Sequence, residues 1–217
     1  MSGRPAKAAR RRGRPSTAEL AEGAPAARDR ILSAARAEFA ERGYEKTSIR
    51  GIARGADVDP ALVHHYFGSK EEVFAAAVEG AFAPALQVPE LLSTGTAEDM
   101  GERLARFMFG IWENEATREP LLAIMRSAVN NETAARIFRG LISRQLVTRV
   151  AGELKGPDAT LRVELAVSQL VGSALLRYVI KVEPLASADP EELVRRLAPV
   201  VQHHLVGEPL GDGTSGA

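Results

Sequence analysis

The sequence predicts an all-α protein made of two helical domains. Apolar residues recur at intervals of three and four along most of the 217 residues, which is the periodicity of helices with one buried face. Helix-capping residues precede several of these stretches, and no stretch alternates between apolar and polar residues as a half-buried strand would. The length is sufficient for one large domain or two modest ones.

The first 26 residues are rich in Arg, Ala, Gly and Pro and lack helical periodicity, so we expect a flexible basic arm. The formal net charge of the chain is zero, and the positive charge near the N-terminus is therefore a local feature. It is carried by Arg4, Lys7, Arg10, Arg11, Arg12 and Arg14.

The chain contains no cysteine, which excludes disulfides, thiolate zinc sites and cysteine nucleophiles. No apolar run typical of a secretory signal occurs at the N-terminus. The longest apolar stretch, Leu165–Leu176, is bounded by Glu164 and Arg177 and is shorter than the roughly 20 residues of a membrane span. We expect a cytoplasmic protein in which this stretch forms a buried helix.

The first helix follows the arm and ends at Gly43, which we expect in the left-handed conformation. Its apolar face consists of Ile31, Leu32, Ala35 and Phe39. A second helix is predicted to start at Thr47, an N-cap residue type, and to end at the sequence RGAD.

Asp59 is placed to cap a third, short helix with Pro60 in its first position. Gly68 interrupts the chain, and Ser69 with Glu72 has the pattern of a capping box that opens a fourth helix. A helix, a tight turn and a short helix over about residues 48–67 indicate a helix-turn-helix unit.

The stretch TSIRGIARGADVDPALVHHYFGSKEEVF, which begins at Thr47, resembles the DNA-binding segment of TetR-type transcriptional regulators. The likeness extends from about Arg28 to Ala83 and includes Phe39, Gly43-Tyr44, Ile52-Ala53, Val58, Tyr66-Phe67 and Ser69-Lys70. The resemblance implies a DNA-binding domain over residues 27–83 and a homodimer. It also implies a divergent second domain that binds a small effector.

The adjacent pair His64 and His65 allows three interpretations: a metal site, a solvated helix face or a DNA contact. Their side chains diverge by roughly 100°. Helical metal pairs use i, i+4 spacing, and no further ligands lie nearby in the sequence, so we predict no metal here. We favour DNA contact.

The pattern of this helix places Leu62, Val63, Tyr66 and Phe67 on the inward side. Ala61, His64 and His65 are then left to face a DNA groove, with the Tyr66 hydroxyl within reach of a phosphate.

Thr47 and Ser48 lie at the start of the second helix, where hydroxyls and free backbone N–H groups favour an anion. Lys70 supplies a cation at the other flank of the motif. The resemblance implies phosphate contacts for these three residues, although helix capping alone would explain Thr47.

The arm sequence RRRGRP, Arg10 to Pro15, resembles the core of AT-hook segments. Arg10, Arg12 and Arg14 are therefore candidates for insertion into a narrow minor groove. Nonspecific attraction to phosphates, or no role, are the alternatives.

Residues 84–206 are predicted to form a second helical domain, followed by a flexible Gly-rich tail over 207–217. The stretch from Pro84 to Asp99 has the composition of a connector. Helices are expected at about Asp99–Glu115, Glu119–Val129, Glu132–Leu154, Ala159–Val182 and Pro190–Val206.

Five residues of this domain are candidates to line an effector cavity: Phe107, Met108, Trp112, Met125 and Phe138. Residues of these types at helical spacing are also typical of ordinary core. We find no arrangement of catalytic or metal-binding residues, and we expect neither enzyme activity nor a cofactor.

The stretch Leu165–Leu176 is apolar around the whole helix and therefore needs cover on two sides. The last two helices are predicted to form a dimer interface, which the resemblance also implies; the alternative is a central core helix of a monomer. The candidate interface residues are Leu165, Gln169, Gly172, Leu176, Leu197 and Val201.

These observations predict a homodimeric DNA-binding repressor that a small-molecule effector releases from a palindromic operator in double-stranded DNA. One alternative is a helical ligand-binding or scaffold dimer without specific DNA recognition. A small helical enzyme is another.

Overall fold

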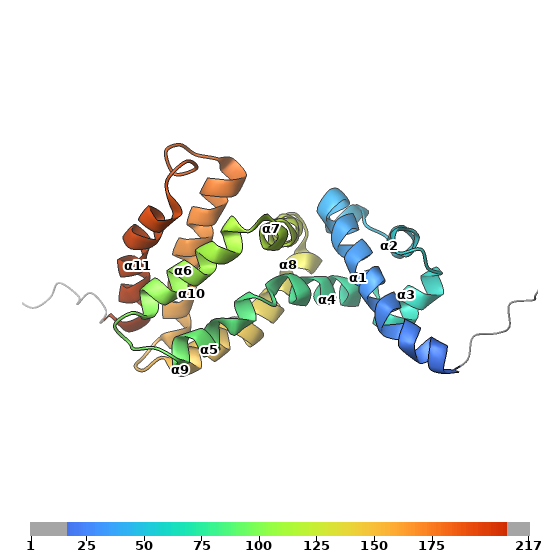
Figure 1. Cartoon of the computed structure of the whole chain (residues 1–217), viewed down its shortest axis with the longest axis horizontal. Coiled ribbons are helices and arrows are strands. Elements are labelled where there is room, and N and C mark those ends of the chain that lie inside the picture. The colour runs from blue at the N-terminus through green and yellow to red at the C-terminus, as the bar shows by residue number, and fades with distance from the viewer. Residues whose placement is uncertain (1–16, 208–217) are drawn as a thin grey trace, which may run out of the picture.

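The computed structural model describes residues 17–207 and confirms the predicted all-α class, since no strand occurs among these residues. Figure 1 shows a small N-terminal domain at one end of an elongated molecule and a larger helical domain at the other. Helix α4 (Lys70–Phe82) runs between the two domains.

The N-terminal domain packs around an aromatic cluster. Its other helices are α1 (Thr17–Lys46), α2 (Ile49–Gly55) and α3 (Pro60–Phe67). Phe74 of α4 contacts both Phe39 and Tyr44 edge to face, and the ring centroids are 5.0 Å apart in each pair. Aromatic pairs of this geometry stabilise a core beyond their buried area. The first half of α4 is therefore part of the core of the N-terminal domain.

Two predicted helix starts are confirmed. Asp59 Oδ1 accepts a hydrogen bond from the Ala61 N–H at 2.7 Å, and Pro60 is the first residue of α3. At the start of α4, the Glu72 N–H donates to Ser69 Oγ at 3.2 Å and the Ser69 N–H donates to Glu72 Oε2 at 2.8 Å. This reciprocal pair is the predicted capping box.

The predicted N-cap at Thr47 is wrong by one residue. Ser48 caps α2, accepting a hydrogen bond from the Gly51 N–H at 3.1 Å. The Thr47 side chain is buried, and its hydroxyl lies 2.8 Å from the Gly43 carbonyl oxygen and 3.1 Å from that of Glu38. Thr47 thus ties the start of α2 to the end of α1.

Helix α1 begins at Thr17 rather than after Ala26, and so takes in the last part of the predicted arm. The sequence AELAE after Thr17 consists of strong helix formers, which accounts for the earlier start. Residues 1–16, including Arg10, Arg12 and Arg14, lie outside the described residues. Gly43 has the expected positive φ of 70°, but its ψ of 173° is extended rather than left-handed helical.

Three predicted helices of the C-terminal domain occur at slightly different or identical bounds: α6 (Met100–Glu113), α7 (Glu115–Asn130) and α11 (Pro190–Val206). The predicted helix Glu132–Leu154 is divided into α8 (Glu132–Ile142) and α9 (Thr148–Glu153), and the predicted helix Ala159–Val182 begins as α10 (Ala159–Ala174). Two π-helical segments, η2 (Ser143–Val147) and η3 (Leu175–Ile180), follow α8 and α10. The predicted connector is itself partly helical, with the short elements η1 (Ala85–Gln87) and α5 (Val88–Ser93).

Helices α6 and α11 pack closely because Gly101 has no side chain. A Cβ atom at this position would lie 2.5 Å from the Gln202 backbone nitrogen and 2.6 Å from the Ala198 carbonyl oxygen. The Gln202 side chain in turn accepts a hydrogen bond from the Gly101 N–H. This contact fixes the position of α6, which carries several cavity residues.

The stretch Ala159–Ile180 is long and apolar enough to cross a membrane by length and composition, and 28% of its apolar window is buried within the protein. The same length and composition occur in core helices of soluble proteins. One side of α10 packs against α11, while another side exposes large apolar residues. The protomer thus supplies one of the two covers that the sequence predicts for this helix, and the burial of the other side depends on a second copy of the chain.

Candidate nucleic-acid interface and ligand cavity

Helix α3 presents the face that the sequence predicts. Val63 and Phe67 are buried in the core of the N-terminal domain. Ala61, His64 and His65 are exposed. Leu62 and Tyr66 are half-buried at the boundary. An exposed helix face with ring N–H groups and a phenol can donate hydrogen bonds to base edges and phosphates in a groove.

The two histidines differ in their surroundings. His64 Nδ1 lies 2.6 Å from the Gly68 carbonyl oxygen and therefore donates a hydrogen bond to it at the C-terminal end of α3. The His65 ring packs edge to face against Tyr66, with the centroids 5.3 Å apart. His65 is thus oriented by an apolar contact and is the freer of the two to read a base edge.

The two flanks of the motif carry the other predicted anchors. Ser48 is exposed at the start of α2, whereas the Thr47 hydroxyl is engaged within the protein. Lys70 Nζ lies 4.5 Å above the Tyr44 ring and donates a hydrogen bond to the Glu45 carbonyl oxygen at 3.2 Å. These contacts hold the Lys70 ammonium group at the surface beside α1.

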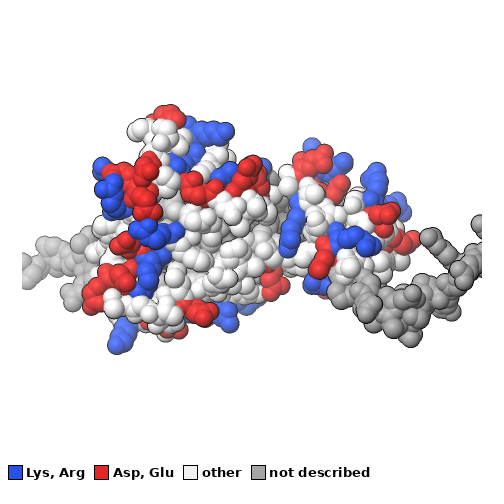
Figure 2. Space-filling model, viewed as in Figure 1, with Lys and Arg blue, Asp and Glu red and all other residues white. Residues whose placement is uncertain are grey.

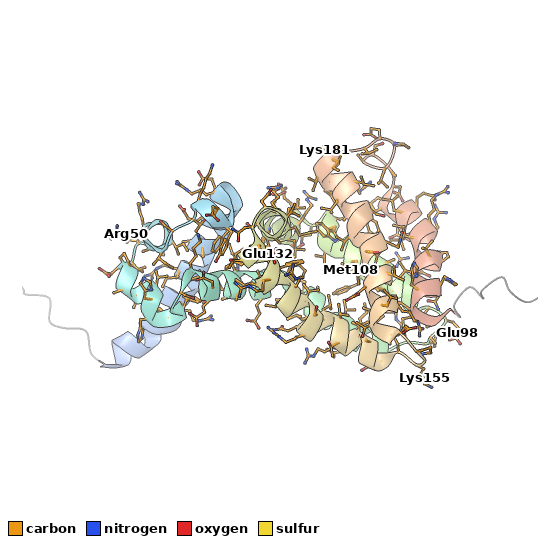
Figure 3. The ribbon with its side chains drawn as sticks, turned by 180° about the vertical axis from the view of Figure 1, so that it is seen from behind. Arg50, Glu98, Met108, Glu132, Lys155 and Lys181 are labelled. Carbon is orange, nitrogen blue, oxygen red and sulfur yellow. The ribbon has the colours of Figure 1, made fainter. Side chains whose placement is uncertain are left out.

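Three further exposed cations lie beside the motif: Lys46, Arg50 and Arg54. Lys46 is the last residue of α1, whereas Arg50 and Arg54 are four residues apart on α2 and so lie on its side away from the buried Ile52 and Ala53. In Figure 3, Arg50 lies at the outer end of the N-terminal domain. The four-residue spacing of basic residues beside the predicted DNA-binding motif is the sequence pattern that could have indicated them.

A cavity of about 320 Å³ lies within the C-terminal domain. Its wall comes from η1, η2 and five α-helices, and the α-helices are represented by Phe82 of α4, Trp112 of α6, Met125 of α7, Phe138 of α8 and Val171 of α10. Figure 3 shows Met108, another wall residue, inside this bundle. The volume is at the lower end of the range of small-molecule sites.

Four of the five predicted cavity residues line this cavity: Met108, Trp112, Met125 and Phe138. Phe107 does not, and is half-buried on another side of α6. The contributions of α4, α10 and η2 were not predicted from the sequence, because they depend on how helices distant in sequence pack together. The segment η2 supplies Ser143, Leu146 and Val147.

Comparison with known proteins identifies both domains. Residues 31–77 match the family "Bacterial regulatory proteins, tetR family", and residues 98–205 match "Tetracyclin repressor-like, C-terminal domain". A TetR-family regulator of Streptomyces coelicolor A3 is 39% identical, and the alignment covers 84% of this chain and 96% of that structure with a TM-score of 0.63. The chain belongs to the TetR family of transcriptional regulators.

Other similar proteins are more distant. The transcriptional regulator BetI of Agrobacterium fabrum is 24% identical over 176 residues, which cover 78% of this chain and 85% of BetI. The structure of a SmeT–triclosan complex is 22% identical with a TM-score of 0.65, over 88% of this chain and 98% of SmeT, and shows the shared fold. This TetR-family protein is accordingly a DNA-binding transcriptional regulator.

A polar network borders the cavity of this TetR-family protein at Trp112. The Trp112 ring stacks on Tyr178 with the centroids 6.4 Å apart. The Tyr178 hydroxyl donates to Glu113 Oε1 at 2.5 Å, and the buried Arg177 donates to the same oxygen at 3.1 and 3.2 Å. Burial, followed by the hydrogen bond to Glu113, raises the pKa of Tyr178 to about 12. The network joins the end of α6 to η3.

The surface predicted to form the dimer interface is largely exposed. Leu165, Leu176 and Gln169 are exposed, and Gly172 and Leu197 are half-buried. Val201 is fully buried, so its assignment to the interface is wrong; it faces the core side of α11. Four exposed residues of α10 and its continuation, unforeseen from the sequence, extend the apolar stripe: Leu161, Val179, Ile180 and Val182.

Charges of both signs are interspersed over the two domains in Figure 2, in keeping with the zero net charge of the chain. Within residues 17–207, no group of three or more His, Asp or Glu side chains is arranged to hold a metal ion.

Proposed function

We propose that this regulator is a repressor that binds a pseudo-palindromic operator as a homodimer and is released by a small molecule in the cavity. The observation that carries the proposal is the position of α4. Its first half supplies Val73 and Phe74 to the core of the N-terminal domain, and its last residue, Phe82, lines the cavity. One helix therefore contacts both a ligand and the DNA-reading unit.

The DNA-contacting residues follow from exposure and charge. Ala61, His64, His65 and Tyr66 of α3 face the groove. Ser48, Lys70 and the exposed cations of α2 contact phosphates on either side. The basic arm adds a contact that is sensitive to salt.

A homodimer is supported by the apolar stripe of α10 and η3. Large apolar side chains exposed in a row indicate an interaction surface, because burying them against a second copy removes them from water. Two-fold symmetry of the protein is matched by two half-sites about one helical turn of DNA apart, or a multiple of this spacing.

The cavity has no catalytic arrangement of side chains, and we assign it to effector binding rather than to catalysis. An effector releases DNA only if it binds the DNA-incompetent arrangement of the two reading domains more tightly than the competent one. The proposed location of the protein is the cytoplasm, where the operator and a metabolite are both accessible.

Gel retardation with DNA from upstream of the coding sequence of this protein tests the proposal. We expect a specific complex that survives competitor DNA and a footprint with two symmetric half-sites. Addition of a small-molecule extract of the cell should weaken the complex, and mass spectrometry of the retained protein would identify what is bound. Protection of a single asymmetric half-site, or binding that competitor DNA abolishes, would contradict the proposal.

A further inference from the structure

Apart from the Trp112 indole N–H, the polar side-chain groups of the cavity lie at its mouth. Of the seventeen lining residues, thirteen are apolar, and the four polar ones are exposed to solvent: Arg139, Ser143, Glu164 and Ser168. Arg139 and Ser143 are four residues apart on α8 and η2, as are Glu164 and Ser168 on α10. Residues four apart share a helix face, so the mouth lies between these two segments.

The interior of the cavity has no side chain to compensate a charge. An ionised group moved from water into such surroundings without a partner is strongly destabilised. The Trp112 indole N–H is buried and has no hydrogen-bond partner among the described residues, but it carries no formal charge. The body of the effector must therefore be apolar, with any polar group placed at the mouth.

The uncompensated charge at the mouth is negative. The Arg139 guanidinium donates to Glu132 at 2.9 Å, so the charges of this exposed pair offset each other. Glu164 forms no ion pair with any residue in the described range 17–207. Arg162, two residues before Glu164, is bound to backbone carbonyl oxygens, among them that of Lys155 at 2.8 Å. A ligand whose polar end reaches the mouth thus meets a carboxylate without a partner.

Aromatic side chains in the wall favour the same sign of charge. Phe82, Trp112 and Phe138 contribute rings to the lining. A cation close to an aromatic face is stabilised by the ring quadrupole, whereas an anion is not. The wall and the mouth therefore select against the same class of ligand, the organic anions.

We infer that the effector is a lipophilic cation: a compact apolar body with a single amine end that lies beside Glu164. The inference rests on the proposed function of the cavity as the effector site. It specifies the sign of charge that the site accepts, which the family assignment leaves open.

Three probes of equal length test the inference: 4-phenylbutylamine, 4-phenylbutan-1-ol and 4-phenylbutyrate. Trp112 is the sole tryptophan of the chain and lines the cavity, so its fluorescence reports binding directly. We expect the amine to bind most tightly, with an affinity roughly 1.5- to 5-fold higher than that of the alcohol. This is the gain expected from an ion pair with Glu164 that remains exposed to solvent. The carboxylate should bind most weakly.

Glu164→Gln should make the amine and the alcohol bind about equally. The matched control is Glu153→Gln, which removes an exposed carboxylate outside the lining and should preserve the order. Circular dichroism would establish that both variants are folded. Tightest binding of the carboxylate, no binding of any probe, or an amine preference that survives Glu164→Gln would overturn the inference.

Operator binding in the same samples separates this inference from the proposed function. If the amine binds with the expected preference but leaves operator affinity unchanged, the ligand class stands and the release mechanism fails. If the carboxylate binds best and releases DNA, the release mechanism stands and the ligand class fails.

Discussion

We propose different roles in DNA binding for side chains on α3 and at the start of α4. His65 lies on the face proposed to enter the groove, whereas Lys70 is held beside α1 through the Glu45 carbonyl and the Tyr44 ring. Groove residues contact base edges and flank residues contact phosphates, so the two should affect sequence preference differently.

His65→Ala should change the preferred operator sequence as well as the affinity, because a base contact is lost. Lys70→Ala should weaken binding to all sequences about equally and reduce the slope of log affinity against log salt by about 0.9, the value for one phosphate contact. In vitro selection from a random DNA pool measures the preference of each variant. An unchanged site for His65→Ala, with affinity alone reduced, would assign His65 to the phosphate contacts.

Two tyrosines make the stability of the protein sensitive to alkaline pH. Burial, followed by the nearby charge of Glu71, raises the pKa of Tyr44 to about 12, as burial and Glu113 do for Tyr178. The folded pKa exceeds the unfolded value of about 10. The stabilisation is thus present below about pH 10 and is lost as the pH rises toward 12.

We expect Tyr44→Phe and Tyr178→Phe each to flatten the decline of the unfolding free energy between about pH 10 and 12. At neutral pH, Tyr178→Phe should be destabilised by about 1 kcal/mol through loss of its hydrogen bond to Glu113. Tyr44→Phe should hardly change the unfolding free energy at neutral pH, since the Tyr44 hydroxyl has no hydrogen-bond partner among the described residues. Urea unfolding over this pH range measures the unfolding free energy of each protein. If this free energy falls with pH equally steeply in the variants and the wild type, the prediction is wrong.

Single residues were predicted correctly where local sequence decides their role. Asp59, Ser69 and Glu72 act within their own helix starts, so a short pattern was sufficient. Thr47 and Val201 were misassigned because their roles depend on which neighbouring helix covers them. The sequence does not show which of two adjacent hydroxyl residues caps a helix. Nor does it show which apolar residues of one helix are covered by a neighbouring helix.

At the scale of helices, apolar periodicity located α6, α7, α10 and α11 to within a few residues. It missed η1 and α5, whose prolines suggested a connector although proline is tolerated in the first turn of a helix. Apolar periodicity also missed the π-helical segments. In these segments the backbone hydrogen bonds join residues five apart instead of four, and this change leaves no signal in the amino-acid composition.

Gly101→Ala should destabilise the protein, because the new Cβ would meet the α11 backbone at 2.5 Å and the helices would have to separate. Overpacking of this kind typically costs about 1–3 kcal/mol. Gly110→Ala, in the same helix, is the matched control: no atom lies within 4 Å of its Cβ, and helix propensity should stabilise it by up to about 1 kcal/mol. Thermal unfolding measures both variants, and equal shifts of the two midpoints would contradict the close α6–α11 contact.

At the scale of the whole molecule, the cavity and the DNA-reading unit are joined at the contact of Phe82 with Phe138. The two rings meet edge to face with centroids 5.5 Å apart. Phe138 also lines the cavity, and we therefore propose that a ligand which displaces its ring also displaces the end of α4. Because the start of α4 is fixed in the N-terminal core, such a displacement changes the position of the reading unit relative to the C-terminal domain.

Phe138→Ala should therefore weaken ligand-induced release while leaving DNA binding of the free protein largely intact. Allosteric coupling typically changes affinity by about 5- to 150-fold, and the variant should reduce this ratio toward one. The matched control is Phe107→Ala, a half-buried phenylalanine of α6 outside the cavity, which should retain the wild-type ratio. The measurement is operator affinity with and without the molecule captured from the cell extract. Equal loss of release in both variants would show that lowered stability, rather than the contact between Phe138 and Phe82, governs the response.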